Sequence, residues 1–469
     1  MTTLTRKVSS IFSLFRQALA GTEQNFTEGS INRAIFLLSV PMILEMAMES
    51  LLAVVDIFFI SRLNNNDAVT AVGLTESVIA LVYSLAMGLG MAATAMVARR
   101  VGEQDKPGAA IAAVNALYIG AVVSVMITIV GLLFYKEILL LMGASQSVLD
   151  VGAGYTWWML TGNFTIVALF LVNAIFRGAG NAAIAMQSLW IANILNMILD
   201  PLLIFGWGPV PSLGVEGAAI ATNIGRGAGV LYQVYYLMGN RGIVQIKKES
   251  LKYDQVVVIR LLKVAAGNVG QFLISTASWL FLSRIIVNFG SAAFAGYQIA
   301  IRVIIFTILP SWGMANAAAT LVGQNLGAKQ PERAEASVWK AGFLNMVFLG
   351  LVSIVFYFVS EPIMRIFSSD TEVVSYGTQC LRIVAFGYVF YGYGMVIVQA
   401  FNGAGDSRTP TILNLFCYWL FQVPLAWFLA MKLELGAQGA FWAIAIAESV
   451  IAVIAILLFR RGTWKVVKI

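Results

Sequence analysis

Long apolar segments constrain the fold of this chain more than any other feature of its sequence. Twelve can be marked, each with about the 20 residues that an α-helix needs to cross a bilayer. Charged residues make up only 11% of the 469 residues, too few to cover the surface of a soluble protein of this length. We therefore expect an all-α polytopic membrane protein. The expected spans are residues 32–63, 68–98, 109–135, 147–176, 182–206, 214–238, 256–289, 291–322, 337–360, 375–402, 409–431 and 436–459.

Basic residues indicate how these spans are oriented. Lys and Arg gather before the first span, after the even-numbered spans and at the C-terminal end, whereas the opposite loops hold few. By the positive-inside rule both termini are predicted to be cytoplasmic, with the protein in the cell inner membrane. The formal net charge of +7 is then explained by topology, and we expect no nucleic-acid partner.

The two halves of the chain repeat one another. Residues 176–181 (FRGAGN) match residues 401–406 (FNGAGD), and residues 213–218 (LGVEGA) match residues 435–440 (LGAQGA). The two matches have nearly the same offset, 225 and 222 residues. Because each half holds six spans, both halves keep the same orientation. The sequence therefore predicts two pseudo-symmetric six-helix bundles related by an axis along the membrane normal.

A domain organisation follows from the spans and the repeat. The first residues suggest either a short helix on the membrane surface or a disordered tail, because apolar residues recur between positions 11 and 19. A basic polar stretch separates the two halves. The expected domains are an N-terminal cytoplasmic segment (1–29), a first lobe with spans one to six (30–239), a cytoplasmic linker (240–254), a second lobe with spans seven to twelve (255–460) and a cytoplasmic tail (461–469).

One acid lies inside an apolar run of the fifth span. Asp200 follows Asn196 by four residues and directly precedes Pro201. Hydrocarbon does not solvate a carboxylate, so this acid must face a water-filled cavity, find a partner or carry a proton. Asn196 lies on the same helical face and can supply an amide. The repeat aligns Asp200 with Val423, which favours a functional role over the alternative of a structural acid that caps a neighbouring helix.

The first span carries three more acids. Glu45, Glu49 and Asp56 are spaced so that a helix places them along one stripe. Three acids on one transmembrane face cannot all be ionised in hydrocarbon, so they must line an aqueous cavity or hold protons. Two alternatives stay open: Asp56 pairs with Arg62 or anchors the interface, and the two glutamates wet the cytoplasmic half of a cavity. Pro41 predicts a kink on the inner side.

The second half differs from the first because its spans seven to eleven contain no acid. Residues 255–331 contain none, and neither do spans nine to eleven. Their polar residues include Gln271 and Tyr391, which suit a cavity for bulky organic molecules, although most such residues are ordinary packing contacts. Glu76 and Glu448 are expected near helix ends or beside interhelical partners. Any ion-coupling chemistry is therefore expected in the first lobe.

Several function classes are excluded by missing residues. The chain has no histidine, the commonest general base and metal ligand. Cys380 and Cys417 lie in or beside apolar segments, so no disulfide framework or thiolate metal site is expected. No G-x-x-x-x-G-K-[ST] phosphate loop is present. We expect no enzyme, no metal centre and no cofactor.

Several segments together resemble the multidrug and toxic compound extrusion (MATE) transporters. They are VVDIFFISRL in the first span, LVNAIFRGAGN, NMILDPLLIFG followed by LGVEGAAIAT, AAATLVGQNLGAKQPERAE after the eighth span, and FNGAGDSRTP before the eleventh. The resemblance implies twelve helices in two bundles, alternating access, and export of organic cations and other amphiphilic drugs coupled to inward H⁺ or Na⁺. It also implies a coupling site in the first bundle at Asp56, Asn196, Asp200 and Thr222, with Na⁺ possible at the first three.

The same resemblance implies that Pro41 lies at a functional bend. Glu45 and Glu49 depart from the family pattern, in which glutamine is usual at the second position, so the coupling ion and its stoichiometry stay open. A monomer is expected, because one chain holds both halves. The alternatives are a lipid-linked glycan flippase or a narrow-substrate exporter of the same architecture, a passive channel, and a membrane-embedded enzyme.

Overall fold

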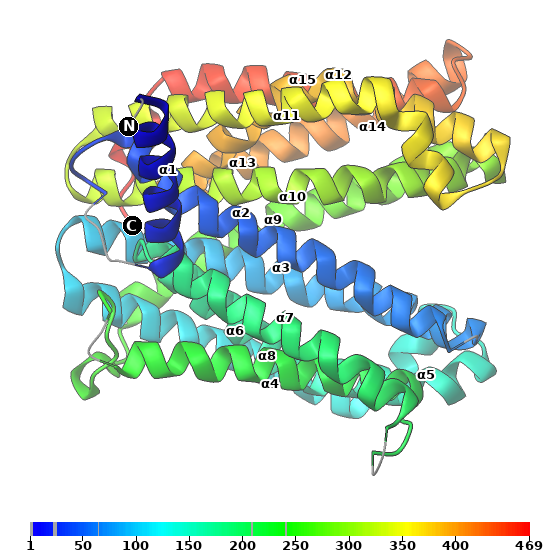
Figure 1. The fold of residues 1–469 in the computed structure, drawn as a ribbon, viewed down its shortest axis with the longest axis horizontal. Coiled ribbons are helices and arrows are strands. Elements are labelled where there is room, and N and C mark those ends of the chain that lie inside the picture. The colour runs from blue at the N-terminus through cyan, green and yellow to red at the C-terminus, as the bar shows by residue number, and fades with distance from the viewer. Residues whose placement is uncertain (1–2, 22–25, 64, 208–209, 240–241) are drawn as a thin grey trace. The chain divides into compact units, whose positions relative to one another are not determined.

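The computed structural model describes residues 3–21, 26–63, 65–207, 210–239 and 242–469, which are mostly helical and contain no β-strand (Figure 1). The α-helices are α1 (Thr3–Ala20), α2 (Ile31–Ser61), α3 (Asn66–Gly102), α4 (Lys106–Leu141), α5 (Gln146–Thr161), α6 (Asn163–Gly178), α7 (Ala182–Phe205), α8 (Gly214–Met238), α9 (Gln255–Val287), α10 (Ser291–Gly327), α11 (Pro331–Phe367), α12 (Thr371–Gly403), α13 (Arg408–Asn414), α14 (Val423–Trp427) and α15 (Ala437–Arg460). Two π-helical stretches, η2 (Leu415–Gln422) and η3 (Phe428–Lys432), alternate with α13 and α14, and η1 (Lys248–Ser250) and η4 (Thr463–Val466) are short 3-10 helices.

These helices confirm the predicted all-α membrane fold. Within the described residues, nine helical stretches are long and apolar enough to cross a bilayer, and α5 with α6 forms a tenth. The remaining predicted spans, the first and the sixth, coincide with α2 and α8. Large apolar side chains such as Leu231, Ile354 and Phe358 point outward, as contact with lipid requires.

The sequence repeat is also a structural repeat at the helix ends. Gly180 after α6 and Gly405 after α12 have nearly the same backbone angle, φ +83° and +85°. In each case the residue after the glycine donates its backbone N–H, at 2.9 Å, to the carbonyl oxygen of Phe176 or Phe401. This left-handed conformation favours glycine, which explains why both copies of the motif keep it.

Contacts divide the chain into two compact units. Unit 1 falls within Met1–Gln24 and Leu44–Ala265, and unit 2 within Asn25–Ile43 and Ala266–Ile469. This division differs from the predicted lobes because it falls inside α2, whose first part packs with unit 2. Gly313 on α10 permits that packing, since a Cβ there would lie 2.7 Å from the carbonyl oxygen of Met42.

The predicted linker packs on unit 1. The side chain of Asn115 on α4 donates to the carbonyl oxygen of Lys252 at 3.1 Å and accepts from the backbone N–H of Asp254 at 3.0 Å. One buried amide thus fixes the end of the segment before α9, so the described part of the predicted linker belongs to this unit.

The fourth span is broken, which the apolar pattern did not predict. α5 and α6 meet at Gly162 with a bend of 41°. Asn223 on α8 fills the break: its Nδ2 donates to the carbonyl oxygen of Trp158 at 3.0 Å, and its Oδ1 accepts from Thr165 at 3.0 Å. A Cβ at position 162 would lie 2.2 Å from Asn223 Oδ1, so only glycine leaves room for this amide.

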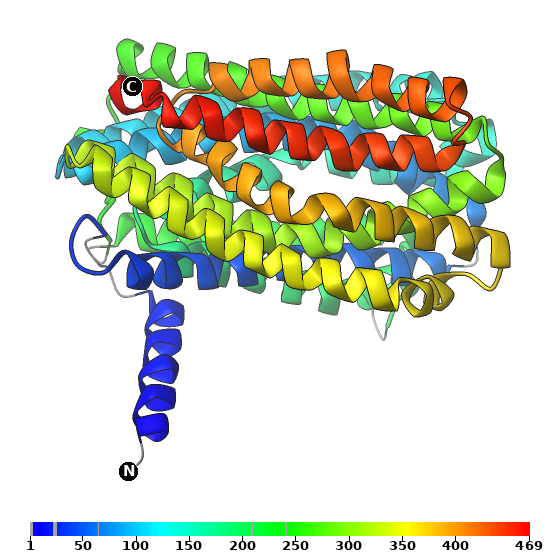
Figure 2. The same cartoon turned by 90° about the horizontal axis from the view of Figure 1, so that it is seen from above.

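Within unit 1, α1 runs across the direction of the membrane-spanning helices (Figure 2). Its end is tied to unit 1 by Gln187 on α7, whose Nε2 donates to the carbonyl oxygen of Leu19 at 3.0 Å. Of the two alternatives for the N-terminal segment, the structure therefore has the helix.

Candidate functional site

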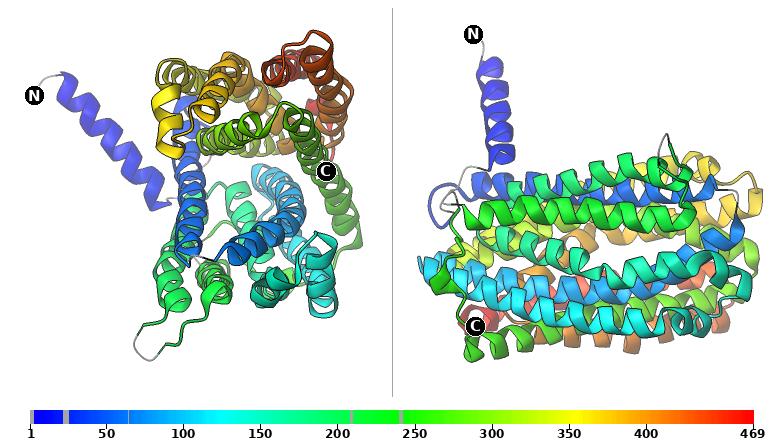
Figure 3. Two further views of the ribbon diagram at one scale, coloured as in Figure 1. Left: turned by 90° about the vertical axis from the view of Figure 1, so that its right-hand side faces the viewer. Right: turned by 90° about the horizontal axis from the view of Figure 1, so that it is seen from below.

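Unit 1 brings together the four residues that the MATE resemblance implied. Asp56 comes from α2, Asn196 and Asp200 from neighbouring turns of α7, and Thr222 from α8. α7 and α8 run side by side (Figure 3). Asp200 and Asn196 are only 1% and 2% exposed, so their polar groups must find partners within the protein.

The side-chain amide of Asn196 connects these residues. With its oxygen toward α8, it accepts from the backbone N–H of Thr222 at 3.0 Å and from Thr222 Oγ1 at 3.1 Å. Its nitrogen then donates to Asp56 Oδ1 at 3.1 Å and to Asp200 Oδ2 at 3.2 Å. The reverse orientation would turn the amide oxygen toward both carboxyl groups, so the hydrogen-bond network assigns the first.

The two carboxyl groups are too close to be ionised together at low cost. Their oxygens lie at most about 6 Å apart, because both are within 3.2 Å of the same nitrogen. At an effective dielectric constant of about 20, two unit charges at that separation repel by about 3 kcal/mol. Asp200 Oδ1 is also buried without a hydrogen bond among the described residues. The pair therefore calls for a bound proton or cation.

Glycines on α8 make this approach possible. A Cβ at Gly225 would lie 2.5 Å from the carbonyl oxygen of Ala192, and one at Gly217 would lie 2.5 Å from that of Leu203. Any side chain at either position would push α8 away from α7. Close helix packing through small residues is what brings Thr222 to Asn196.

Two of the alternatives, a helix cap by Asp200 and an ion pair between Asp56 and Arg62, do not match the contacts. Asp200 faces the Asn196 amide within the bundle, and no described helix end is capped by it. Arg62 lies over the ring of Phe58, 4.9 Å from its centroid, and forms no ion pair with Asp56 among the described residues.

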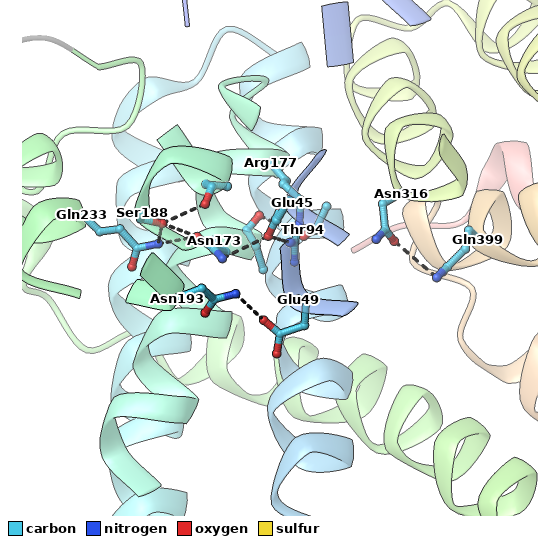
Figure 4. Close-up of polar contacts among 12 residues, drawn as sticks. Glu45, Glu49, Thr94, Asn173, Arg177, Ser188, Asn193, Gln233, Asn316 and Gln399 are labelled. Atoms are coloured by element: carbon cyan, nitrogen blue, oxygen red, sulfur yellow. Dashed lines mark hydrogen bonds and ion pairs between the residues drawn. The ribbon is translucent and has the colours of Figure 1, made fainter. Parts of the chain in front are cut away.

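The two glutamates of α2 lie in separate contacts (Figure 4). Glu45 forms an ion pair with Arg177 at 2.7 Å and accepts from Asn173 Nδ2 at 3.0 Å. Glu49 Oε2 accepts from Asn193 at 3.3 Å. The first contact is buried and continues through Asn173 to Ser188 and Gln233, so Glu45 is part of a hydrogen-bond network.

Two further charged groups of unit 1 come from α3 and α8. Glu76 on α3 accepts from the hydroxyl of Tyr155 at 3.1 Å, the interhelical partner that the sequence predicted as one option. Arg226 on α8, one turn after Thr222, is 7% exposed. Sequence reasoning missed Arg226, because basic residues were read as markers of topology. Asp200 was found as a single charged residue inside an apolar span, and the same criterion would have found Arg226.

The predicted positions in unit 2 have different surroundings. Gln271 is buried in an amide cluster, where its Nε2 donates to Asn402 Oδ1 at 3.0 Å, so it ties α9 to α12. Tyr391 packs against the apolar core. Glu448 accepts from the hydroxyl of Tyr418 at 3.2 Å, on the π-helical stretch η2. Neither Gln271 nor Tyr391 forms a hydrogen bond with Glu448 among the described residues.

Pro41 is buried in unit 2, and α2 continues through it from Ile31 to Ser61 without a break.

Within the described residues no three acids or cysteines are grouped as metal ligands. Cys380 and Cys417 are both buried as free thiols.

Comparison with known proteins gives consistent matches. The MatE family model matches residues 41–202 and 264–428. The probable multidrug resistance protein NorM of Thermotoga maritima is 26% identical over 463 residues, which cover 97% of either chain. The multidrug export protein MepA of Staphylococcus aureus is 24% identical over 434 residues, 92% of this chain and 94% of MepA. A crystal structure of MATE in the straight conformation has a TM-score of 0.89 at 27% identity, over 94% of this chain and 98% of that one.

Proposed function

This chain belongs to the MatE family of multidrug and toxic compound extrusion transporters, and from that premise we propose that it exports amphiphilic drugs and organic cations in exchange for an inward ion. Its relatives NorM and MepA are named for multidrug resistance and multidrug export. They are transporters and not enzymes. The drug is the only substrate besides the coupling ion, and no cofactor takes part.

The observation that carries the proposal is the Asn196 amide shared by Asp56 and Asp200. An ion exchanger needs a group whose charge changes when the ion binds. The shared amide bonds Asp56 Oδ1 and Asp200 Oδ2, and Asp200 Oδ1 has no hydrogen-bond partner among the described residues. Binding of one cation removes the repulsion between the two carboxyl groups, so the bound site is much more stable than the empty one.

The amide orientation favours H⁺ over Na⁺ as that cation. Na⁺ is bound by oxygen atoms, as other hard cations are. The Asn196 oxygen faces Thr222, whereas its N–H faces the carboxyl groups. Na⁺ at the pair would require the amide to turn its oxygen toward the carboxyl groups and to lose the bond from the Thr222 backbone N–H. A proton on one carboxyl group leaves every one of these contacts in place.

The exchange cycle follows from differential binding. Protonation of the pair stabilises the state that releases drug outward, and loss of the proton to the cytoplasm restores the drug-binding state. Because α2 carries both Asp56 and Pro41, a change in its curvature at the proline links ion binding to the drug cavity. Glu49 and Glu45 lie further along α2 toward its cytoplasmic end, where they serve as relays for the departing proton. Gln271 and Tyr391 remain proposed cavity residues.

The test is dye efflux from proteoliposomes that contain only this protein. A pH gradient and a Na⁺ gradient are imposed separately, with ethidium as the transported cation. We expect efflux driven by the pH gradient, and its loss in Asp200→Asn. The matched control is Glu448→Gln, because Glu448 is also an intramembrane acid but bonds the hydroxyl of Tyr418 outside the pair. We expect this variant to keep wild-type efflux.

Other outcomes would assign other functions. Efflux driven by Na⁺ alone would refute the proton but keep the antiporter. Efflux that ignores both gradients would indicate a passive channel. Absence of dye movement under either gradient would favour a narrow-substrate exporter or a lipid-linked glycan flippase. We also propose a monomer in the cell inner membrane with both termini cytoplasmic, as the positive-inside rule predicts.

A further inference from the structure

Arg226 is a buried cation that this cycle leaves unused. Its Nη2 donates to the hydroxyl of Tyr83 on α3, and its guanidinium carbon lies 5.5 Å from the centroid of that ring. Its Nη1 is buried and has no hydrogen-bond partner among the described residues. A desolvated guanidinium nitrogen without a partner is costly. An anion that approached Nη1 in another state of the protein would satisfy it.

Acids on α2 and α3 of the same unit do not pair with this guanidinium. The carboxyl groups that act on its charge are Glu49 and Asp56 on α2 and Glu76 on α3. Glu49 and Glu76 accept hydrogen bonds from neutral groups instead, and no described ion pair within 4.0 Å includes Arg226. Arg226 therefore has no carboxylate partner among the described residues.

We propose that Arg226 is a tethered counter-ion of the coupling site. When the coupling ion leaves Asp56 and Asp200, the guanidinium compensates the negative charge left behind. This role rests on the proposed antiport. A charge fixed to the protein lowers the affinity of the emptied site for the departing ion, because it stabilises the ion-free state and not the ion-bound one. Release into the cytoplasm then becomes possible against the internal concentration of the ion.

A purely structural role makes a different prediction. In that case Arg226 serves to hold α8 against α3 through Tyr83. Loss of the Tyr83 hydroxyl would then reproduce the loss of the guanidinium. For a counter-ion, the charge is what counts, and removing the hydroxyl leaves the charge in place.

The test measures the internal concentration of the coupling ion that halves efflux from proteoliposomes. For Arg226→Gln we expect this concentration to fall about tenfold or more, because about 1.4 kcal/mol of lost attraction between the guanidinium and the carboxyl groups lowers it by that factor. In Arg226→Lys we expect this concentration to recover most of the way to the wild-type value, because lysine restores the positive charge. Tyr83→Phe produces no such fall. Monodisperse protein with an unchanged thermal midpoint shows that each variant is folded.

The outcomes separate the two proposals. If the wild type shows ion-driven efflux but the half-inhibiting ion concentration is unchanged in Arg226→Gln, the counter-ion proposal alone is overturned. An equal fall of this concentration in Arg226→Gln and Tyr83→Phe would overturn it too. Absence of ion-driven efflux in the wild type would overturn the antiport and, with it, the counter-ion.

Discussion

Gly225→Ala is the smallest change that should separate Thr222 from Asn196 in the proposed coupling site. Gly225 lies on α8 where it crosses α7, and a Cβ there would be 2.5 Å from the carbonyl oxygen of Ala192 and 3.1 Å from Asn196 Cβ. The first obstacle is backbone within a helix, which cannot rotate away. The new methyl group therefore has to move α8 as a whole.

The displacement can be worked from these distances. An ordinary contact between a methyl carbon and an oxygen is about 3.4 Å or more, so α8 must retreat by roughly 0.9 Å at this point. The bonds from Thr222 to the Asn196 oxygen are 3.0 and 3.1 Å, and that retreat stretches them to about 4 Å, beyond hydrogen-bond range. Overpacking costs about 1–3 kcal/mol, of which the better helix propensity of alanine offsets about 1 kcal/mol. The protein should fold but lose the orientation of its shared amide.

The chain supplies a matched control on the same helix. A Cβ at Gly227 would meet only Thr165, at 4.0 Å, so Gly227→Ala gains helix propensity without overlap. We expect gradient-driven ethidium efflux to fall at least tenfold in Gly225→Ala and to stay near the wild-type rate in Gly227→Ala. Wild-type efflux in Gly225→Ala, with normal expression, would refute the reasoning that this helix contact builds the site.

Three further outcomes follow from single contacts. Thr222→Val should impair coupled efflux, whereas Thr222→Ser should retain it, because only the second keeps the hydroxyl that bonds the Asn196 oxygen; equal rates in proteoliposomes would contradict this. Arg177→Ala should destabilise the protein by about 3–5 kcal/mol, since it leaves Glu45 buried and unpaired, and an unchanged midpoint of thermal unfolding would show that water compensates the acid. Gly162→Ala should lower the same midpoint by several degrees, because its Cβ collides with Asn223 Oδ1, and a neutral result would mean that the bend between α5 and α6 does not depend on that amide.

Three of the proposed coupling residues could be predicted because a polar or acidic side chain stands out in an apolar run. Asp56 and Asp200 are acids in apolar runs, and Asn196 lies one turn from Asp200 on the same face. Their meeting across α2 and α7 could not be read from spacing, since it depends on how two spans pack. Thr222 was reached only through the family resemblance, because a threonine in a membrane helix is ordinary.

Other features arise from contacts between distant segments. The break at Gly162 depends on Asn223, which lies on another span, so no local signal marks it. The ion pair between Glu45 and Arg177 joins α2 to α6, and the sequence predicted no partner for this glutamate. The π-helical course of η2 likewise leaves no trace in the apolar pattern, which is the same for any buried helix.

The most direct test of the account asks whether drug binding displaces a proton from the Asp56–Asp200 pair. Ethidium is added to the purified protein in weakly buffered detergent solution near neutral pH, and a pH indicator reports released protons. If protonation weakens drug binding, drug binding must release protons by the same linkage. The account predicts release in the wild type and in Glu448→Gln, and none in Asp200→Asn. Release of equal size in Asp200→Asn, or dye binding to the wild type without any release, would contradict it.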